Sequence, residues 1–288
     1  MRLRSAFSMI EVIFVIVVMG IIAKFGAEFL NQAYTSFIFS NINNRLQAQS
    51  ESAVEQIAAK LQYRIKDSII AKQADGTFQA LSSANNAGNI ILEWVGSDVD
   101  GFRGDVLPLW SGIIDVDLDI GQNVNITSPQ SNLASEGALI ASLSSNNSGI
   151  ADSALYFIGS NNDINGYGWD GVALATQDDV MHPIQAGANA DQFQSSNADN
   201  FAGTDVYEFY KLAWTAYAVE IQNNGNLVLY YDYQPWNGEV YTDGQNSLIM
   251  ENVQTFKFVA IGSLVKIQVC TSTTLVENYA ICKEKTIY

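Results

Sequence analysis

The chain opens with a long apolar segment that has very few polar interruptions. Residues 7–23 are hydrophobic at nearly every position, and Glu11 is the one ionisable side chain among them. A run of about 17 residues is at the short end of what a helix needs to cross a bilayer. Apolar residues resume after Lys24, at Phe25 and Phe29, so the helix extends if the Lys24 ammonium reaches the interface. The pattern predicts one membrane-spanning helix over residues 7–30.

Beyond the apolar run the pattern becomes amphipathic. Apolar residues recur at helical spacing on one stripe, which consists of Val54, Ile57, Ala58, Leu61, Ile65 and Ile69. No Pro or Gly interrupts the chain between Ala27 and Gln73. The spacing predicts that the helix continues over residues 31–72, as an amphipathic half that packs on a head formed by residues 73–288.

The head has the sequence pattern of a β-rich domain, because clusters of Gly, Asn, Ser and Asp separate short runs of β-branched and aromatic residues. The expected strands are residues 90–95, 112–120, 154–158, 216–221, 227–233, 253–260 and 264–270, and residues 133–143 form an expected short helix. Asn223 to Asn226 predicts a hairpin turn, and residues 159–205 predict long loops. Without a visible repeat or linker, the pattern favours one α+β head.

The sign of the net charge changes at the boundary between the predicted helix and the head, after residue 72. Of the net charge of −16, residues 1–72 carry +3 and residues 73–288 carry −19. An acidic head is a poor direct partner for nucleic acid. The chain has 48% hydrophobic residues, which excludes a disordered class. The chain has a single histidine, His182, which excludes most metal sites and most histidine-dependent catalysis. His182 precedes Pro183 and is interpreted as a surface or turn residue.

Two cysteines, Cys270 and Cys282, stand near the C-terminus and are too few for a thiolate zinc site. In an oxidising compartment they suit one disulfide, and a pair of buried thiols is the alternative. A loop of this size would stabilise the head by roughly 2–3 kcal/mol.

Residues 1–6 form a short basic leader, which places the N-terminus in the cytoplasm and the rest of the chain beyond the membrane. An ordinary signal peptide would need a small-x-small cleavage site, and residues 20–30 offer no convincing one. A plain signal anchor does not account for Glu11, because a carboxylate deep in hydrocarbon costs several kcal/mol without a partner.

The segment Arg-Ser-Ala-Phe-Ser-Met-Ile-Glu-Val, residues 4–12, resembles the class III signal of type IV pilins and type II secretion pseudopilins. The resemblance implies that a prepilin peptidase cuts between Ala6 and Phe7, and that Phe7 becomes an N-methylated terminus. Glu11 is then the fifth mature residue and serves assembly, by neutralising the Phe7 ammonium of a neighbouring subunit and setting the axial register. The family's usual Gly, Thr and Leu are replaced by Ala6, Ser8 and Met9.

Parts of the head look like the larger minor pseudopilins and minor pilins, of the J and W types. The segments concerned are residues 152–157, 217–219, 226–231 and 248–258. The resemblance implies an α+β, pilin-like lollipop, in which a long N-terminal helix packs on an antiparallel β-sheet head with long loops. It implies a non-enzymatic subunit of an inner-membrane, single-pass type with a periplasmic head, which initiates or caps a filament. The implied partners are prepilin peptidase, other pseudopilins or pilins and the inner-membrane assembly platform.

One ligand is suggested by the loop chemistry. Asn161, Asp163, Asn165 and Gly166 match the start of an Asp-x-Asp-x-Asp-Gly calcium loop. Position twelve is Val172, which excludes an EF-hand, so a different cage would be closed by Asp170, Asp178 or Asp179. Structural calcium is the one candidate cofactor, and no other cofactor is assigned. A second acidic feature, at Asp115, Asp117 and Asp119, predicts a strand with a solvated face.

An alternative function is a membrane-anchored envelope protein that binds a ligand or hydrolyses a substrate. This class needs a cleft with histidine, carboxylates or serine in mutual reach, and the sequence supplies no convincing set. Gly166-x-Gly168-x-x-Gly171 has dinucleotide spacing, but it follows an Asn-rich loop and no helical pattern follows it.

Overall fold

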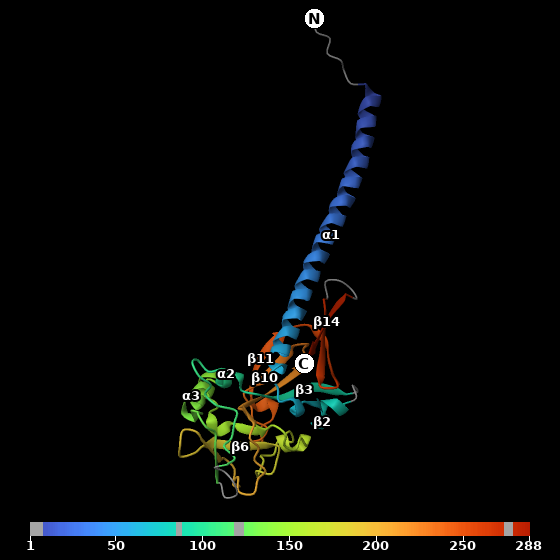
Figure 1. The fold of residues 1–288 in the computed structure, drawn as a ribbon. Coiled ribbons are helices and arrows are strands. Elements are labelled where there is room, and N and C mark those ends of the chain that lie inside the picture. The colour runs from blue at the N-terminus through green and yellow to red at the C-terminus, as the bar shows by residue number, and fades with distance from the viewer. Residues whose placement is uncertain (1–7, 85–87, 118–123, 274–278) are drawn as a thin grey trace. The chain divides into compact units, whose positions relative to one another are not determined.

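The computed structural model describes residues 8–84, 88–117, 124–273 and 279–288. The chain separates into two units, Met1–Gln49 and Ser50–Tyr288, and each is described by itself. Helix α1 (Met9–Leu61) begins in the first unit and ends in the second (Figure 1).

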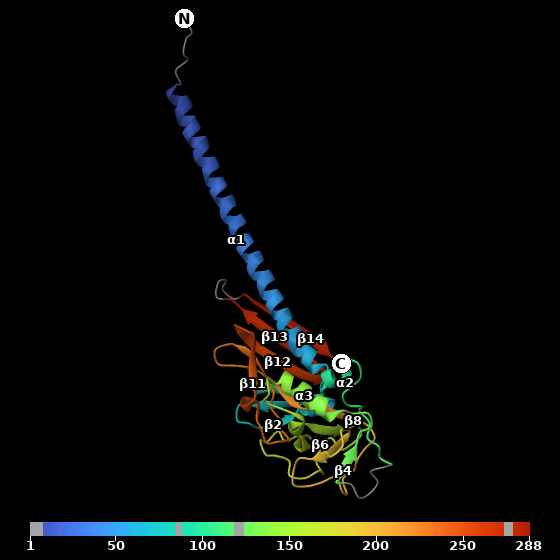
Figure 2. The same ribbon diagram turned by 90° about the vertical axis from the view of Figure 1, so that its left-hand side faces the viewer.

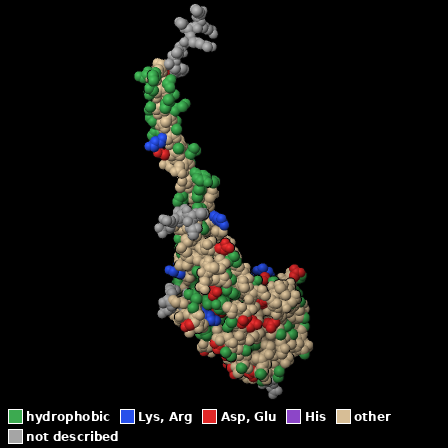
Figure 3. Space-filling model, turned by 180° about the vertical axis from the view of Figure 1, so that it is seen from behind, with side chains coloured by type: hydrophobic (Ala, Val, Ile, Leu, Met, Phe, Trp, Pro, Cys, Tyr) green, Lys and Arg blue, Asp and Glu red, His purple; other side chains and the backbone are tan. Residues whose placement is uncertain are grey.

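The first unit is a single apolar helix. Its large hydrophobic side chains, from Met9 to Phe39, are almost all exposed. Within the described residues, α1 is the one helix long and apolar enough to cross a membrane, with a mean hydropathy of 2.3 over its most apolar window. Figure 3 shows these apolar side chains along the helix. The expected apolar N-terminal helix is confirmed, and it supports a single-pass membrane protein.

The second unit consists of antiparallel sheets with short helices. A six-stranded sheet has the order β11 (Gln245–Met250), β10 (Leu227–Tyr231), β9 (Thr215–Ile221), β3 (Asn89–Gly96), β1 (Ile70–Gln73) and β2 (Phe78–Ala80). A three-stranded sheet has β12 (Val253–Ile261), β13 (Leu264–Ser272) and β14 (Ala280–Ile287). A five-stranded sheet has β4 (Asn125–Thr127), β7 (Gln192–Ser195), β6 (Met181–Ala186), β5 (Ala154–Phe157) and β8 (Tyr210–Ala213). The helices are α2 (Val99–Arg103) and α3 (Leu133–Leu143).

Three apolar clusters hold this unit together. In the first, Ile57 and Leu61 of α1 are fully buried with residues of the six-stranded and three-stranded sheets, such as Val219 and Ile267. In the second, the other face of the six-stranded sheet is covered by aromatic loop residues that include Trp236. The third lies on the five-stranded sheet. Figure 2 shows β13 and β14 at one end of the unit and β4 and β6 at the other.

Much of the expected element pattern is confirmed, including the α+β class and helix α3, whose bounds coincide with the expected residues 133–143. Strands β3, β5, β9, β10, β12 and β13 lie where strands were expected. The hairpin between β9 and β10 closes with hydrogen bonds from Gln222 N to Asn226 O, at 2.8 Å, and from Gly225 N to Gln222 O, at 2.9 Å.

The expectation of a helix up to residue 72 was wrong, because α1 ends at Leu61. Arg64 is buried and donates to the carbonyls of Leu61 (2.8 Å), Ser263 (3.1 Å) and Tyr288 (3.2 Å), so its guanidinium closes the end of the helix. Ile65 and Ile69 keep helical spacing in the sequence but have extended backbone on either side of a short 3₁₀ turn. Both side chains are buried, but from extended backbone and not from the face of a helix.

Two further expectations were wrong. The described part of the 112–120 segment, residues 112–117, contains no strand and makes one bridge, from Ile113 to Phe209. Asp115 and Asp117 therefore do not form a strand face, and Asp119 lies outside the described residues. Residues 159–205 are not all loop, because they contain β6 and β7, whose short length and polar residues hid them.

Replacing Ile57 by alanine should lower the free energy of unfolding by roughly 2–5 kcal/mol, because it leaves a cavity between α1 and two sheets. Chemical denaturation of the full chain in detergent measures the change. The matched control is Gln56→Ala, one residue away and exposed, which should change stability by less than about 0.5 kcal/mol. Equal losses in the two variants would contradict the packing described.

Candidate functional site

The structure describes part of the N-terminal site that the resemblance implies. Ala6 and Phe7 lie outside the described residues. Glu11 lies in the first turn of α1 and is exposed, and the Ser8 N–H donates to Glu11 Oε2 at 3.4 Å. A serine followed three residues later by glutamate is the pattern of a capping box, in which the carboxylate satisfies a free N–H at the helix start. Within its own chain, Glu11 thus caps the N-terminus of α1.

The two cysteines are joined, as the sequence predicts. Cys270 in β13 and Cys282 in β14 are directly opposite each other and form a disulfide with a Cα–Cα distance of 4.0 Å. The bond ties two strands of the three-stranded sheet together next to the β13–β14 connection.

The candidate calcium loop, Asn161–Gly166, leads into a short 3₁₀ turn, Ile164–Tyr167, whose N-cap is Asp163. Its polar side chains bind within the loop: Asn161 Oδ1 accepts from the Asp163 N–H at 3.2 Å, and Asp163 Oδ1 accepts from both nitrogens of Asn165, at 3.0 and 2.9 Å. Burial raises the pKa of Asp179, and the charges of Asp178 and Asp163 add to the rise. Among the described residues, no group of three or more His, Cys, Asp or Glu side chains is arranged to hold a metal. Calcium binding stays a prediction.

The interpretation of His182 as a surface or turn residue was wrong. His182 lies in β6, is 3% exposed and packs against the rings of Phe157 and Phe201. Burial lowers its pKa to about 4, so the imidazole is neutral at physiological pH. Enclosed in this way, His182 is out of reach of a substrate.

Two buried carboxyl groups face each other between α2 and α3. Asp98 caps α2 by accepting from the Gly101 N–H at 3.2 Å, and it accepts from the Trp110 indole N–H at 2.7 Å. Glu136 of α3 is fully buried. Burial and the neighbouring Asp98 raise the pKa of Glu136 to about 9, so the Glu136 carboxyl group is neutral at physiological pH. A methyl group on Gly101 would collide with both carboxyl groups.

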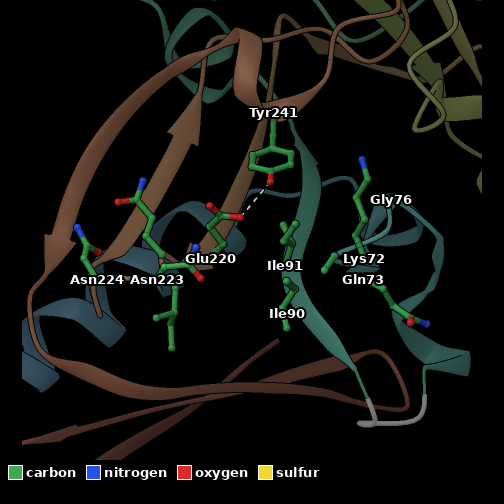
Figure 4. Close-up of a pocket in the computed structure, with 12 residues that line it drawn as sticks. Lys72, Gln73, Gly76, Ile90, Ile91, Glu220, Asn223, Asn224 and Tyr241 are labelled. Carbon is green, nitrogen blue, oxygen red and sulfur yellow. Dashed lines mark hydrogen bonds between the residues drawn. The ribbon is translucent and has the colours of Figure 1, made fainter.

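The chain also forms a notch at one end of the six-stranded sheet, with a volume of about 670 Å³. Figure 4 shows Lys72 and Gln73 on one side, Glu220, Asn223 and Asn224 on the other, and β3 between them. Register explains the arrangement, because Ile91 is directly opposite Lys72 on one neighbouring strand and Glu220 on the other. Directly opposite residues share a face of a sheet.

A buried ion pair lies beside this notch. Lys72 Nζ is 3.2 Å from Glu93 Oε1, and both side chains are almost fully buried. Tyr233 donates its hydroxyl to Glu93 Oε2 at 3.2 Å. Burial raises the pKa of Glu93, and the Lys72 ammonium opposes that rise. Breaking such a pair costs several kcal/mol, since it leaves an uncompensated buried charge.

The sequence analysis missed the notch and its charged residues. A signal was present, because Lys72 follows Ile69, Ile70 and Ala71, and Glu93 lies within the apolar run of β3. An isolated charge in the buried stretch of a strand needs a partner. The identity of that partner depends on which strands are neighbours, which the sequence pattern does not state.

Comparisons with protein-family models, with curated proteins and with solved structures found no match to this chain.

Glu136 should make stability fall as pH rises. Its pKa is about 9 in the folded chain, against an ordinary value of 4.5, so the folded state holds the proton more tightly. The stabilisation is complete below about pH 4.5 and is lost as pH rises through about 9, with a slope of up to about 1.4 kcal/mol per pH unit. The unfolding free energy of Glu136→Gln minus that of wild type, measured from pH 5 to 9, should therefore increase with pH. A difference as flat as that of the exposed control Glu251→Gln would contradict the assignment.

If the Asn161–Gly166 loop binds calcium, chelation should lower the melting temperature of the full chain. At free calcium about 100-fold above the dissociation constant, binding stabilises by about 2.7 kcal/mol. Asp163→Ala should abolish the difference between calcium and chelator, whereas the exposed control Asp105→Ala should keep it. The same melting temperature for wild type with calcium and with chelator would contradict calcium binding by this loop.

Proposed function

We propose that this chain is a minor pseudopilin or minor pilin, a structural and non-enzymatic subunit that initiates or caps a type II secretion pseudopilus or type IV pilus. The observation that carries the proposal is the segment of residues 4–12, which combines a basic leader, Phe7 and Glu11 at the start of an apolar helix. In this proposal the chain is cut after Ala6, anchored in the inner membrane by α1 and delivered to a filament tip.

The energetics of Glu11 support an assembly role. A carboxylate in hydrocarbon is costly unless a partner neutralises it. Among the residues that the structure describes, the Glu11 carboxylate accepts one long hydrogen bond, from the Ser8 N–H at 3.4 Å. That bond does not neutralise the charge, whereas the N-methylated Phe7 ammonium of a second subunit would.

The apolar surface of the first unit supports the same role. Hydrophobic side chains lie on all sides of α1 between Met9 and Leu30, and none of its most apolar window is buried. A helix with apolar side chains all around is suited to lipid or to a bundle of equivalent helices. The second unit would then be the periplasmic head, and its disulfide is typical of an oxidising compartment.

A second candidate, a membrane-anchored ligand-binding protein, is favoured by the notch beside Glu220. This candidate requires the N-terminal helix only as an anchor. It therefore requires neither cleavage before Phe7 nor a carboxylate at Glu11. Identifying the first residue of the mature chain distinguishes the two functions.

In cells with a prepilin peptidase, the mature chain should begin at N-methylated Phe7, as read by mass spectrometry of the N-terminal peptide. Glu11→Val should still be cleaved and inserted, because the change removes a carboxylate from the apolar segment. The variant should fail to cross-link to the other minor subunits, since the unpaired Phe7 ammonium costs several kcal/mol in a buried interface. Head folding, read from the Cys270–Cys282 disulfide, should be unchanged.

Glu28→Val is the matched control, because it removes a carboxylate from the same helix, where Glu28 lies 4.0 Å from Lys24. This control should be processed and cross-linked as wild type. An unprocessed N-terminus in wild type would overturn the proposed function. Normal cross-linking of Glu11→Val would overturn the assembly role of Glu11.

A further inference from the structure

The notch at the end of the six-stranded sheet presents one oriented carboxylate. Glu220 is half-buried at the end of β9, and each of its oxygens accepts from a tyrosine: Tyr230 to Oε1 at 3.2 Å and Tyr241 to Oε2 at 3.0 Å. Gln222 in turn donates to the Tyr230 hydroxyl at 3.1 Å. Figure 4 shows Tyr241 pointing at Glu220.

These hydroxyls are permanent donors. Burial and the Glu220 charge raise the pKa of Tyr230 and of Tyr241, so both phenols stay protonated. Two donors aimed at one carboxylate fix its position and leave lone pairs on each oxygen free for a further donor. Among the described residues, Glu220 forms no ion pair with a lysine or arginine.

Lys72, the cation that lines the notch, does not serve Glu220. Ile91 lies between them on the central strand, so their strands are two sheet spacings, about 10 Å, apart. The Lys72 ammonium is occupied by Glu93 at 3.2 Å, by the Trp169 carbonyl at 3.5 Å and by the Tyr241 ring, whose centroid is 5.8 Å away. Among the described residues that line the notch, Glu220 is therefore the carboxylate, and no lysine or arginine pairs with it.

The rest of the lining suits an organic cation. Ile90, Ile91 and Ile221 supply apolar surface, and Asn223 and Asn224 are exposed amides at the rim. A divalent metal needs several oxygen ligands, and no group of three or more His, Cys, Asp or Glu was found in the described parts of the chain. A guanidinium or ammonium on an aliphatic stem matches both parts of the lining, because the stem covers apolar surface while the head group meets the carboxylate.

We propose that this notch binds a lysine or arginine side chain presented by a partner protein, with Glu220 as its counter-ion. The net charge of −16 favours a basic partner, since an acidic surface attracts cationic groups from solution. The site belongs to the second unit alone, so the proposal does not rest on the pilin assignment.

The test uses the full chain in detergent and two small probes, Nα-acetylarginine methylamide and its neutral isostere Nα-acetylcitrulline methylamide. Saturation-transfer NMR, titrated over millimolar concentrations, reports on binding. The arginine probe should bind at least about fivefold more tightly than the citrulline probe, and Glu220→Gln should remove that preference. Higher salt should weaken arginine binding, because a half-buried charge is still screened.

The control is Glu208→Gln, an equal change of charge at an exposed position outside the six-stranded sheet, which should bind as wild type. Equal binding of the two probes to wild type would overturn the proposal, and this comparison does not depend on the folding of any variant. An absence of saturation transfer from arginine, or unchanged preference in a Glu220→Gln chain of normal melting temperature, would overturn it as well.

Discussion

The burial of the last turns of α1 between two antiparallel sheets is the contact on which the second unit depends. Ile57 and Leu61 are fully enclosed by residues of the six-stranded and three-stranded sheets. An antiparallel sheet buries at least one face, and the last turns of α1 cover one of the two buried faces of the six-stranded sheet. Arg64 follows the end of the helix and donates to the Ser263 carbonyl in the β12–β13 turn. The chain then continues into β1, which pairs with β3.

Register in turn decides where the buried charges meet. Lys72 and Glu93 lie on neighbouring strands of the six-stranded sheet and form a pair 3.2 Å long. A slip of one residue would turn each side chain to the opposite face of the sheet, and the pair would be lost. The same register places Glu220 across Ile91 from Lys72, where it remains available to a ligand. The proposed cation site is thus a consequence of strand alignment.

The first unit follows different physics. Between Met9 and Leu30 its apolar side chains are almost all exposed and are not packed against the rest of the described chain. A helix of this kind gains stability from lipid or from other helices. In such surroundings one carboxylate has a large effect, because its charge is expensive wherever it is not paired. In the proposed function, Glu11 is the carboxylate that a neighbouring subunit must neutralise. In the second unit, by contrast, the buried carboxyl groups have partners within the chain, except Glu136, which is protonated.

The sequence by itself determined the elements that depend on local pattern. The apolar run from residue 7 determined the N-terminal helix, and the 3.6-residue period placed Ile57 and Leu61 on its buried face. The β-branched runs located β3, β9 and β13, and Asn223 to Asn226 located a hairpin, because turn chemistry is a property of neighbouring residues. The two cysteines predicted their own bond.

Only the tertiary structure decided the features that depend on distant residues. Ile65 and Ile69 continue the helical spacing, yet both have extended backbone. The Ile65 N–H donates to the Val95 carbonyl of β3 at 2.9 Å and the Ile69 carbonyl accepts from the Leu81 N–H at 3.0 Å, and these tertiary bonds outweigh a weak local preference for helix. His182 is buried because Phe157 and Phe201, far away in sequence, enclose it. The pairing of Lys72 with Glu93 and the separation of Glu220 from Lys72 follow from sheet order, which sequence periodicity does not contain. A strand's pattern shows which face is buried, and the fold alone decides what it is buried against.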